Sequence, residues 1–299
     1  MIGGTIGTTR SKSERRTLGK ISMNDSLLTW GARSDVGCVR ADNEDAFRIA
    51  PELGLFVLSD GMGGQASGEV ASRLAAETIV AHCRAANSNG SSPHTSPPAV
   101  AGPSEVSNTL ADAVRRANVE IRQAAAKNPA WRGMGATIVV ARFDGQRMSL
   151  AHVGDSRAYR LRSGALEQLT QDHSFVAEQV RRGILTQQQA EQSELQNVLL
   201  RALGPDLEVD VELEEELVLD GDTFLLCSDG LTRELSDVQV AAVLHSAKDA
   251  QAAADQLVDL ANEAGGEDNI TAIVVRRPER PGGPFAPMAR WFKRSEKKF

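Results

Sequence analysis

The order of strand-like and helix-like segments constrains the fold of this 299-residue chain more than any other feature of its sequence. Short strand patterns come first and two helical stretches follow. A second group of strands, two more helices and a final strand complete the chain. A strict alternation of strand and helix, which builds a parallel sheet, is absent. The order therefore predicts an α+β fold, in which antiparallel sheets form a sandwich with helices packed outside.

Individual segments carry clear local signals. The apolar run LGLFVLSD (53–60) ends at Asp-Gly, as a buried strand does when it opens into a turn. Asp144-Gly145 and Ser163-Gly164 predict two hairpins. Ser236 and Gln239 form a capping box before a helix. Further strands are expected at 136–143, 147–155, 157–163, 209–219, 223–229 and 269–275. Helices are expected at 67–86, from 106 to about 128, and from 249 to about 264.

Composition along the chain predicts one main domain, residues 26–276, between two basic ends. Residues 1–25 are expected to be a disordered basic arm, and residues 277–299 a basic tail. Inside the domain, 87–104 reads as a flexible Ser/Pro loop. The polar stretch of about 172–203 is expected to be helical and to form a mobile surface subdomain. The tail carries Trp291 and Phe292 beside basic residues, so contact with an anionic lipid or an acidic partner is the alternative to a solvated tail.

Charge and composition exclude several classes of function. Between residues 21 and 275 there are 20 basic and 37 acidic residues, a net charge of −17. Such a surface is unsuited to binding nucleic acid, because the phosphate backbone must be neutralised by Lys and Arg. Three cysteines without metal spacing argue against a disulfide framework and a zinc ribbon. We find no membrane span, no signal peptide and no glycine-rich loop for a nucleotide cofactor. A cytoplasmic protein is expected, with a monomer as the default.

Five aspartates stand where predicted strands meet turns, and together they suggest a metal site. They are Asp45, Asp60, Asp155, Asp229 and Asp268. Each alone would be an ordinary turn residue. If the strand ends converge, their charges repel unless cations lie between them. Oxygen ligands without nearby His or Cys suit Mg²⁺ or Mn²⁺, and two such ions can hold a water for in-line attack on phosphorus. Arg40 could bind the phosphate.

Five short motifs follow one another along the chain: RADNEDAF (40–47), LSDGMGG (58–64), AHVGDSRAY (151–159), CSDGL (227–231) and GEDNIT (266–271). Their order resembles that in the metal-dependent serine/threonine protein phosphatases of the PPM or type 2C family, in its bacterial branch. The resemblance covers about residues 28–276. It implies a β-sandwich of two antiparallel sheets flanked by helix pairs. It also implies that 172–203 is the flap beside the metal-binding cleft.

The resemblance also implies a role for each matched residue. Asp60 would bridge two metals, one of them also bound by the backbone carbonyl of Gly61, while Asp229 and Asp268 would complete the shell of the other. Glu44 and Asp45 match the acidic pair that contacts the metals directly or through water, and Arg40 matches the phosphate-binding arginine. Asp155 would help hold a third, weaker ion, and Asn269 would orient the neighbouring groups.

One departure concerns the proton donor to the leaving oxygen. Animal members of the family carry His after the Asp-Gly pair, whereas this chain has Met62, which cannot donate a proton. Either water near Asp155 or one of two histidines, His152 and His173, would serve instead.

The leading prediction is therefore a Mg²⁺- or Mn²⁺-dependent phosphatase of phosphoserine and phosphothreonine proteins. Two core ions and a possible third are expected. The partners would be a bacterial Ser/Thr kinase and its substrates. Two alternatives stay open at this point: a catalytically silent module that binds phosphorylated partners, and a two-metal hydrolase of small phosphoesters.

Overall fold

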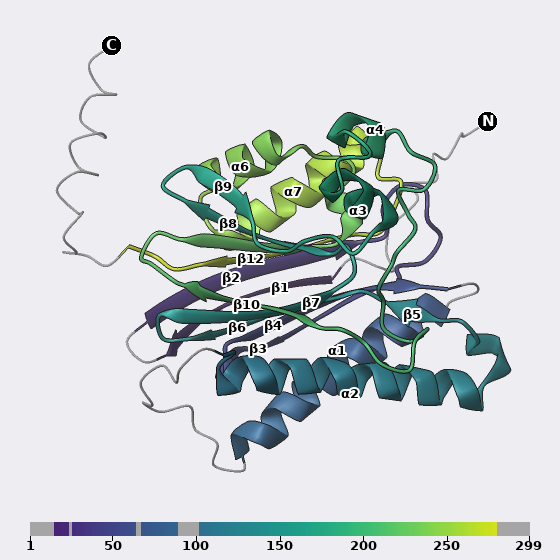
Figure 1. The fold of residues 1–299 in the computed structure, drawn as a ribbon. Helices are drawn as coiled ribbons and strands as arrows, with labels where there is room; N and C mark the ends of the chain where they lie inside the picture. Colours follow the sequence, from purple (N-terminus) through teal and green to yellow (C-terminus); the bar gives the residue numbers. More distant parts are fainter. Residues whose placement is uncertain (1–14, 24–25, 64–66, 89–101, 280–299) are drawn as a thin grey trace, which may run out of the picture.

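The computed structural model describes residues 15–23, 26–63, 67–88 and 102–279. Figure 1 shows its layers: two sheets face each other, and a pair of helices covers the outer face of each. Every strand pair in both sheets is antiparallel. The predicted α+β sandwich is therefore confirmed.

One sheet has the strand order β10-β7-β6-β4-β3, with β5 paired to β4 off this path. Its strands are β3 (Asp45–Ala50), β4 (Leu55–Met62), β5 (Gly135–Ala136), β6 (Ile138–Asp144), β7 (Arg147–Val153) and β10 (Glu212–Leu217). The inner strands β4, β6 and β7 are buried along almost their whole length, because helices cover one face and the second sheet the other. This explains why they are continuous apolar runs. The edge strand β10, ELEEEL, is largely polar.

The second sheet has the order β1-β2-β12-β11-β8-β9. Its strands are β1 (Arg15–Met23), β2 (Ser26–Asp35), β8 (Arg157–Arg162), β9 (Ala165–Gln168), β11 (Thr223–Cys227) and β12 (Ile270–Arg276). Both predicted hairpins are confirmed. Gly145 lies in the β6–β7 turn, and Ser163 and Gly164 join β8 to β9. All three have positive φ, as tight hairpin turns require.

Strand β1 lies within the stretch 1–25 that was expected to be a basic arm. It pairs with β2 over its full length, so backbone hydrogen bonding orders residues with little apolar patterning of their own. Gly19 allows the close approach to Trp30, since a Cβ at this position would lie 2.1 Å from an indole carbon. Residues 1–14 and 24–25 lie outside the described residues.

Two helix pairs complete the layers. The first sheet is covered by α1 (Ser67–Ser88) and α2 (Glu105–Lys127), and the second by α6 (Asp237–Ser246) and α7 (Ala250–Ala264). Ser104 caps α2, and the predicted capping box of Ser236 and Gln239 is present. Most of the expected Ser/Pro loop (89–101) and most of the expected tail (280–299) lie outside the described residues.

The flap region contains two short helices, α3 (Phe175–Arg181) and α4 (Gln187–Glu191), and the helix α5 (Asp229–Thr232) follows β11. Within the part of the chain that the structure describes, no helix is both long and apolar enough to cross a membrane.

The core has three layers of apolar side chains. Two lie between a sheet and its helices, and the third lies between the sheets. The third layer contains a row of edge-to-face aromatic contacts, in which Phe143 lies between Phe56 and Phe224 with ring centroids 5.6 and 5.2 Å apart. Because Phe56 and Phe143 belong to one sheet and Phe224 to the other, this row holds the sheets together.

We expect Phe143→Ala to lower the free energy of unfolding by about 3 to 5 kcal/mol, because it leaves a cavity between the sheets. Urea unfolding followed by circular dichroism measures the change. The control Val238→Ala, at a residue that is 79% exposed on α6, should change stability by less than about 0.5 kcal/mol. Equal effects of the two substitutions would contradict this view of the core.

Candidate active site

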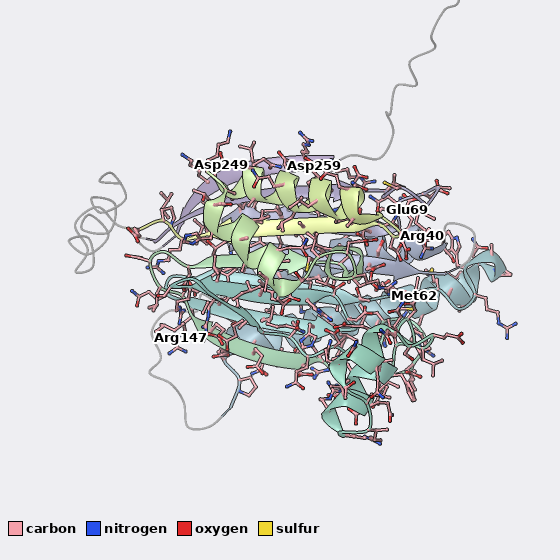
Figure 2. All side chains as sticks on the ribbon, turned by 90° about the horizontal axis from the view of Figure 1, so that it is seen from above. Arg40, Met62, Glu69, Arg147, Asp249 and Asp259 are labelled. Carbon is pink, nitrogen blue, oxygen red and sulfur yellow. The ribbon has the colours of Figure 1, made fainter. Side chains whose placement is uncertain are left out.

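The predicted site residues meet at one end of the sandwich. Figure 2 shows Arg40 and Met62 at this end, while Arg147 and Asp249 lie at the opposite end. A cavity of about 210 Å³ opens here. It is lined by Arg40, Glu44, Asp60, Gly61, Met62, Gly63, Thr137, Asp155, Asn197, Leu199, Asp229, Arg233, Asp268 and Asn269.

Both sheets supply carboxylates to this end. Asp45 and Asp60 are cross-strand neighbours on β3 and β4, and Asp155 follows β7 of the same sheet. From the second sheet, Asp229 follows β11 and Asp268 precedes its neighbour β12. Antiparallel pairing places the end of β11 beside the start of β12, which is why residues far apart in sequence meet.

Asp45 is buried and does not line the cavity. Its Oδ2 accepts hydrogen bonds from Ser228 Oγ at 2.8 Å and Thr271 Oγ1 at 2.6 Å, while its Oδ1 has no hydrogen-bond partner. The two hydroxyls fix the carboxylate, which leaves Oδ1 to bind another group. Neither hydroxyl was predicted from the sequence to belong to the site, although Ser228 directly precedes Asp229 and Thr271 lies two residues after Asn269.

The backbone around Gly61 requires glycine. A Cβ on Gly61 would lie 2.1 Å from the carbonyl oxygen of Gly68, and one on Gly68 would lie 2.6 Å from the carboxyl carbon of Glu44. This close packing holds the Glu44 side chain between the start of α1 and the cavity. Thr137 fixes the neighbouring Asp60, since its Oγ1 accepts from Asp60 N at 3.1 Å and its own N–H donates to Asp60 O at 2.8 Å.

Asn269 anchors the loop that carries Arg40 and Glu44. Its Oδ1 accepts from Glu44 N at 2.7 Å, and its Nδ2 donates to the carbonyls of Val36 and Asp42, both at 3.0 Å. These bonds connect the loop to the residue next to Asp268, as expected of a group that orients the site.

Two arginines line the cavity. Arg40 Nη2 donates to Asp268 Oδ2 at 2.8 Å and is about half exposed, so its guanidinium lies at the rim. Arg233, which the sequence analysis did not single out, forms an ion pair with Asp229. The distance from its Nη1 to Asp268 Oδ2 is 3.8 Å. Its position four residues after Asp229, across a helical turn, was the only sequence signal for this contact.

The clustered carboxylates perturb one another. Burial, together with the charges of the other four aspartates, raises the pKa of Asp60 well above its usual range. Burial also raises the pKa of Asp45 to about 7 and that of Asp155 to about 8, and Asp229 adds to both shifts. Groups of like charge are thus held together at a free-energy cost, which bound cations would relieve.

The residues present fit a divalent metal. Among the described residues, Asp45 and Asp229 are the two cavity-end aspartates with a buried carboxylate oxygen that has no hydrogen-bond partner. The donors gathered here are oxygen atoms, which suit Mg²⁺ or Mn²⁺ better than Zn²⁺. The same cavity is lined by six of the predicted ligands, and the seventh, Asp45, lies at the same end of the sandwich. The six are Glu44, Asp60, Gly61, Asp155, Asp229 and Asp268.

Neither histidine considered as proton donor is among the described residues that line the cavity. His173 Nδ1 accepts from Gly154 N at 3.1 Å, so its Nε2 carries the proton that is donated to Glu212 Oε2 at 2.8 Å. His152 stacks on His173 with ring centroids 4.8 Å apart. These buried rings connect β7, the flap entrance and β10, and they do not face the place where a substrate would bind.

The flap contributes directly to the cavity through Asn197 and Leu199. Backbone contacts fix this segment, since Ser174 forms a β-bridge with Leu199 and Leu200 N donates to His173 O at 2.7 Å. The flap therefore forms one wall of the cavity.

Comparison with known proteins agrees with this geometry. The family model "Protein phosphatase 2C" matches residues 38–269, most of the chain. The chain belongs to the protein phosphatase 2C family. It is 35% identical over 248 residues to the serine/threonine phosphatase stp of Listeria monocytogenes, which covers 82% of this chain and 94% of that protein. It is 37% identical over 249 residues to PstP of Mycobacterium tuberculosis, which covers 83% of this chain but only 45% of PstP, so the chain spans about half the length of that relative.

Solved structures of phosphatase 2C proteins superpose on the chain. The crystal structure of M. tuberculosis PstP has a TM-score of 0.74 at 36% identity, and covers 85% of this chain and 99% of that one. A second structure, the PstP catalytic domain in complex with two manganese ions, has a TM-score of 0.71 at 35% identity, with coverage of 84% and 99%. These matches show that the chain shares its fold and about a third of its aligned residues with structures described as serine/threonine phosphatases.

The raised pKa values predict how the stability of the metal-free protein depends on pH. A carboxyl group whose pKa is higher in the folded chain binds its proton more tightly there, so folding loses free energy as pH rises from the unfolded-chain pKa to the folded-chain pKa. We expect the melting temperature of EDTA-treated protein to fall between about pH 5.5 and pH 8 and to level off above that, because the folded pKa is about 7 for Asp45 and about 8 for Asp155.

Differential scanning fluorimetry at several pH values measures this slope. Asp155→Asn should flatten it, and Mn²⁺ should remove most of it at pH 8.5, because a cation replaces the protons. A metal-free melting temperature that rises over this range would contradict the electrostatic account.

Proposed function

We propose that this chain is a metal-dependent phosphoprotein phosphatase that hydrolyses phosphoserine and phosphothreonine. The observation that carries the proposal is the carboxylate cluster with an arginine at its rim. Six acidic side chains converge at one end of the sandwich, and Arg40 stands over Asp268 where an incoming phosphate would arrive. The family to which the chain belongs supports the same reaction.

Two core Mn²⁺ or Mg²⁺ ions, and a third held more weakly, are proposed. Asp60 and the carbonyl of Gly61 would hold one core ion, and Asp60, Asp229 and Asp268 the other. Glu44 and Asp45 would contact these ions directly or through water, and Asp155 with Asp229 would hold the third. When bound, the ions would lower the pKa of water and offset charge on the phosphate. A relative's catalytic domain was solved with two manganese ions.

The chain's own residues would bind and orient the substrate. The guanidinium of Arg40 can donate two parallel hydrogen bonds to phosphate oxygens. Hydrogen bonds from Asn269 hold the loop that carries Arg40 and Glu44 next to Asp268. Because neither histidine lines the cavity and Met62 has no proton to give, we propose that water beside Asp155 protonates the leaving seryl or threonyl oxygen.

The two alternatives receive less support. A silent binding module would have lost metal-binding residues, whereas each predicted ligand is present and lies at the cavity end. A hydrolase of small phosphoesters would not need the flap wall of Asn197 and Leu199, which would give contact area to the peptide around a phosphorylated residue.

The partners that follow from this reaction are phosphorylated proteins and the Ser/Thr kinase that produces them. A cytoplasmic location and a monomeric state stay predictions. So does the division into an arm (1–25), a catalytic domain (26–276) and a tail (277–299), together with contact of that tail with anionic lipid or an acidic partner.

Hydrolysis of p-nitrophenyl phosphate and of a phosphothreonine peptide tests the proposal. We expect activity with Mn²⁺, none with EDTA, and a loss of at least about 100-fold in kcat for Asp60→Asn and Asp229→Asn, because each removes a negative ligand from the metal site. The control Asp112→Asn, at an exposed residue of α2, should behave as the wild type. Full activity in EDTA or in both cavity variants would refute the mechanism.

A further inference from the structure

Arg233 lines the cavity, but neither the sequence nor the proposed reaction gives this residue a role. It follows α5 directly, keeps a helical backbone, and donates its N–H to Asp229 O at 2.9 Å. This places its side chain one turn from that of Asp229, in the cavity wall and with 30% of its surface exposed. The position is therefore fixed by the backbone.

The guanidinium of Arg233 binds the same carboxylates that are proposed to hold metal. Its Nη2 forms an ion pair with Asp229 Oδ2, and its Nη1 lies 3.8 Å from Asp268 Oδ2. The other oxygen of Asp229, Oδ1, is buried without a hydrogen-bond partner. Asp268 Oδ2 also accepts from Arg40, so Asp268 has a second counter-ion, whereas Arg233 is the one described partner that neutralises Asp229.

Charge balance indicates what this contact does. Five carboxylates line the cavity, and Arg40 and Arg233 are the two cations facing them among the described residues. In the metal-free protein, Arg233 reduces repulsion that would otherwise destabilise the fold. Once a divalent cation binds to Asp229 and Asp268, the same guanidinium becomes a like charge beside the metal. A contact that is more favourable without metal than with it must lower metal affinity.

We propose that Arg233 is an internal counter-ion of Asp229 and Asp268 that stabilises the metal-free protein and weakens its affinity for the activating metal. Arg233 thereby sets the metal concentration at which the enzyme becomes active. It acts through these two carboxylates and is a positioning residue. The inference rests on the proposed metal-dependent function.

Isothermal titration of EDTA-treated full-length protein with Mn²⁺ tests this inference through the dissociation constant. We expect Arg233→Gln, which keeps most of the side-chain volume but removes the charge, to lower the Kd about tenfold. The melting temperature of the metal-free variant should fall. Arg233→Lys should restore both values toward those of the wild type, because a positive charge is again present.

The matched control is Arg48→Gln, which removes an arginine of similar exposure (32%) whose ion pair with Glu77 lies on β3 and α1. It should leave the Kd for Mn²⁺ unchanged. An unchanged or weaker affinity in folded Arg233→Gln, as judged by circular dichroism, would overturn the counter-ion role. A Kd for Arg233→Lys equal to that of Arg233→Gln would do the same.

These outcomes are distinguishable from failure of the proposed function. If the wild type neither binds Mn²⁺ nor hydrolyses p-nitrophenyl phosphate, the metal-dependent function is wrong. If the wild type does both and the affinity of Arg233→Gln does not tighten, only the role of Arg233 is wrong.

Discussion

The mutual repulsion of carboxylates held at one end of the sandwich is the interaction on which the rest of the site depends. Asp45, Asp60, Asp155 and Asp229 are buried deeply enough for their pKa values to rise, and each is brought near the others by strand pairing that the core enforces. Folding therefore costs electrostatic free energy at this end of the sandwich, and bound cations offset that cost. Arg40 and Arg233 supply part of that positive charge from within the chain.

The antiparallel sandwich is well suited to impose this arrangement. Asp45 and Asp60 face each other across one strand pair, and the β11–β12 pair brings Asp229 and Asp268 to the same end from the other sheet. The row of aromatic rings holds the two sheets together and so fixes the relative position of the two groups of carboxylates at their ends. A loss of packing in the middle of the molecule should therefore affect the site by changing the relative position of the two sheets.

Much of the fold and of the candidate site could be predicted from the sequence, because strand patterns, turn residues and five ordered motifs carried the information locally. The strand β1 could not, since it forms through backbone pairing with β2 and has little apolar alternation. The contacts of Ser228, Thr271 and Thr137 depend on tertiary register, which a single sequence does not reveal. For His173 the sequence was misleading. Its position in the motif QDHS made it a candidate proton donor in the cavity, whereas its ring is hydrogen-bonded to Gly154 and Glu212.

The central claim is that the carboxylate end of the sandwich is a divalent metal site. Equilibrium dialysis against Mn²⁺, followed by elemental analysis, tests it without reference to catalysis. The account predicts at least two Mn²⁺ ions per chain in the wild type and the loss of at least one in Asp60→Asn, whose side chain lies between both groups of ligands in the proposal. A wild-type chain that retains no Mn²⁺, or an Asp60→Asn chain that retains the full number, would contradict it.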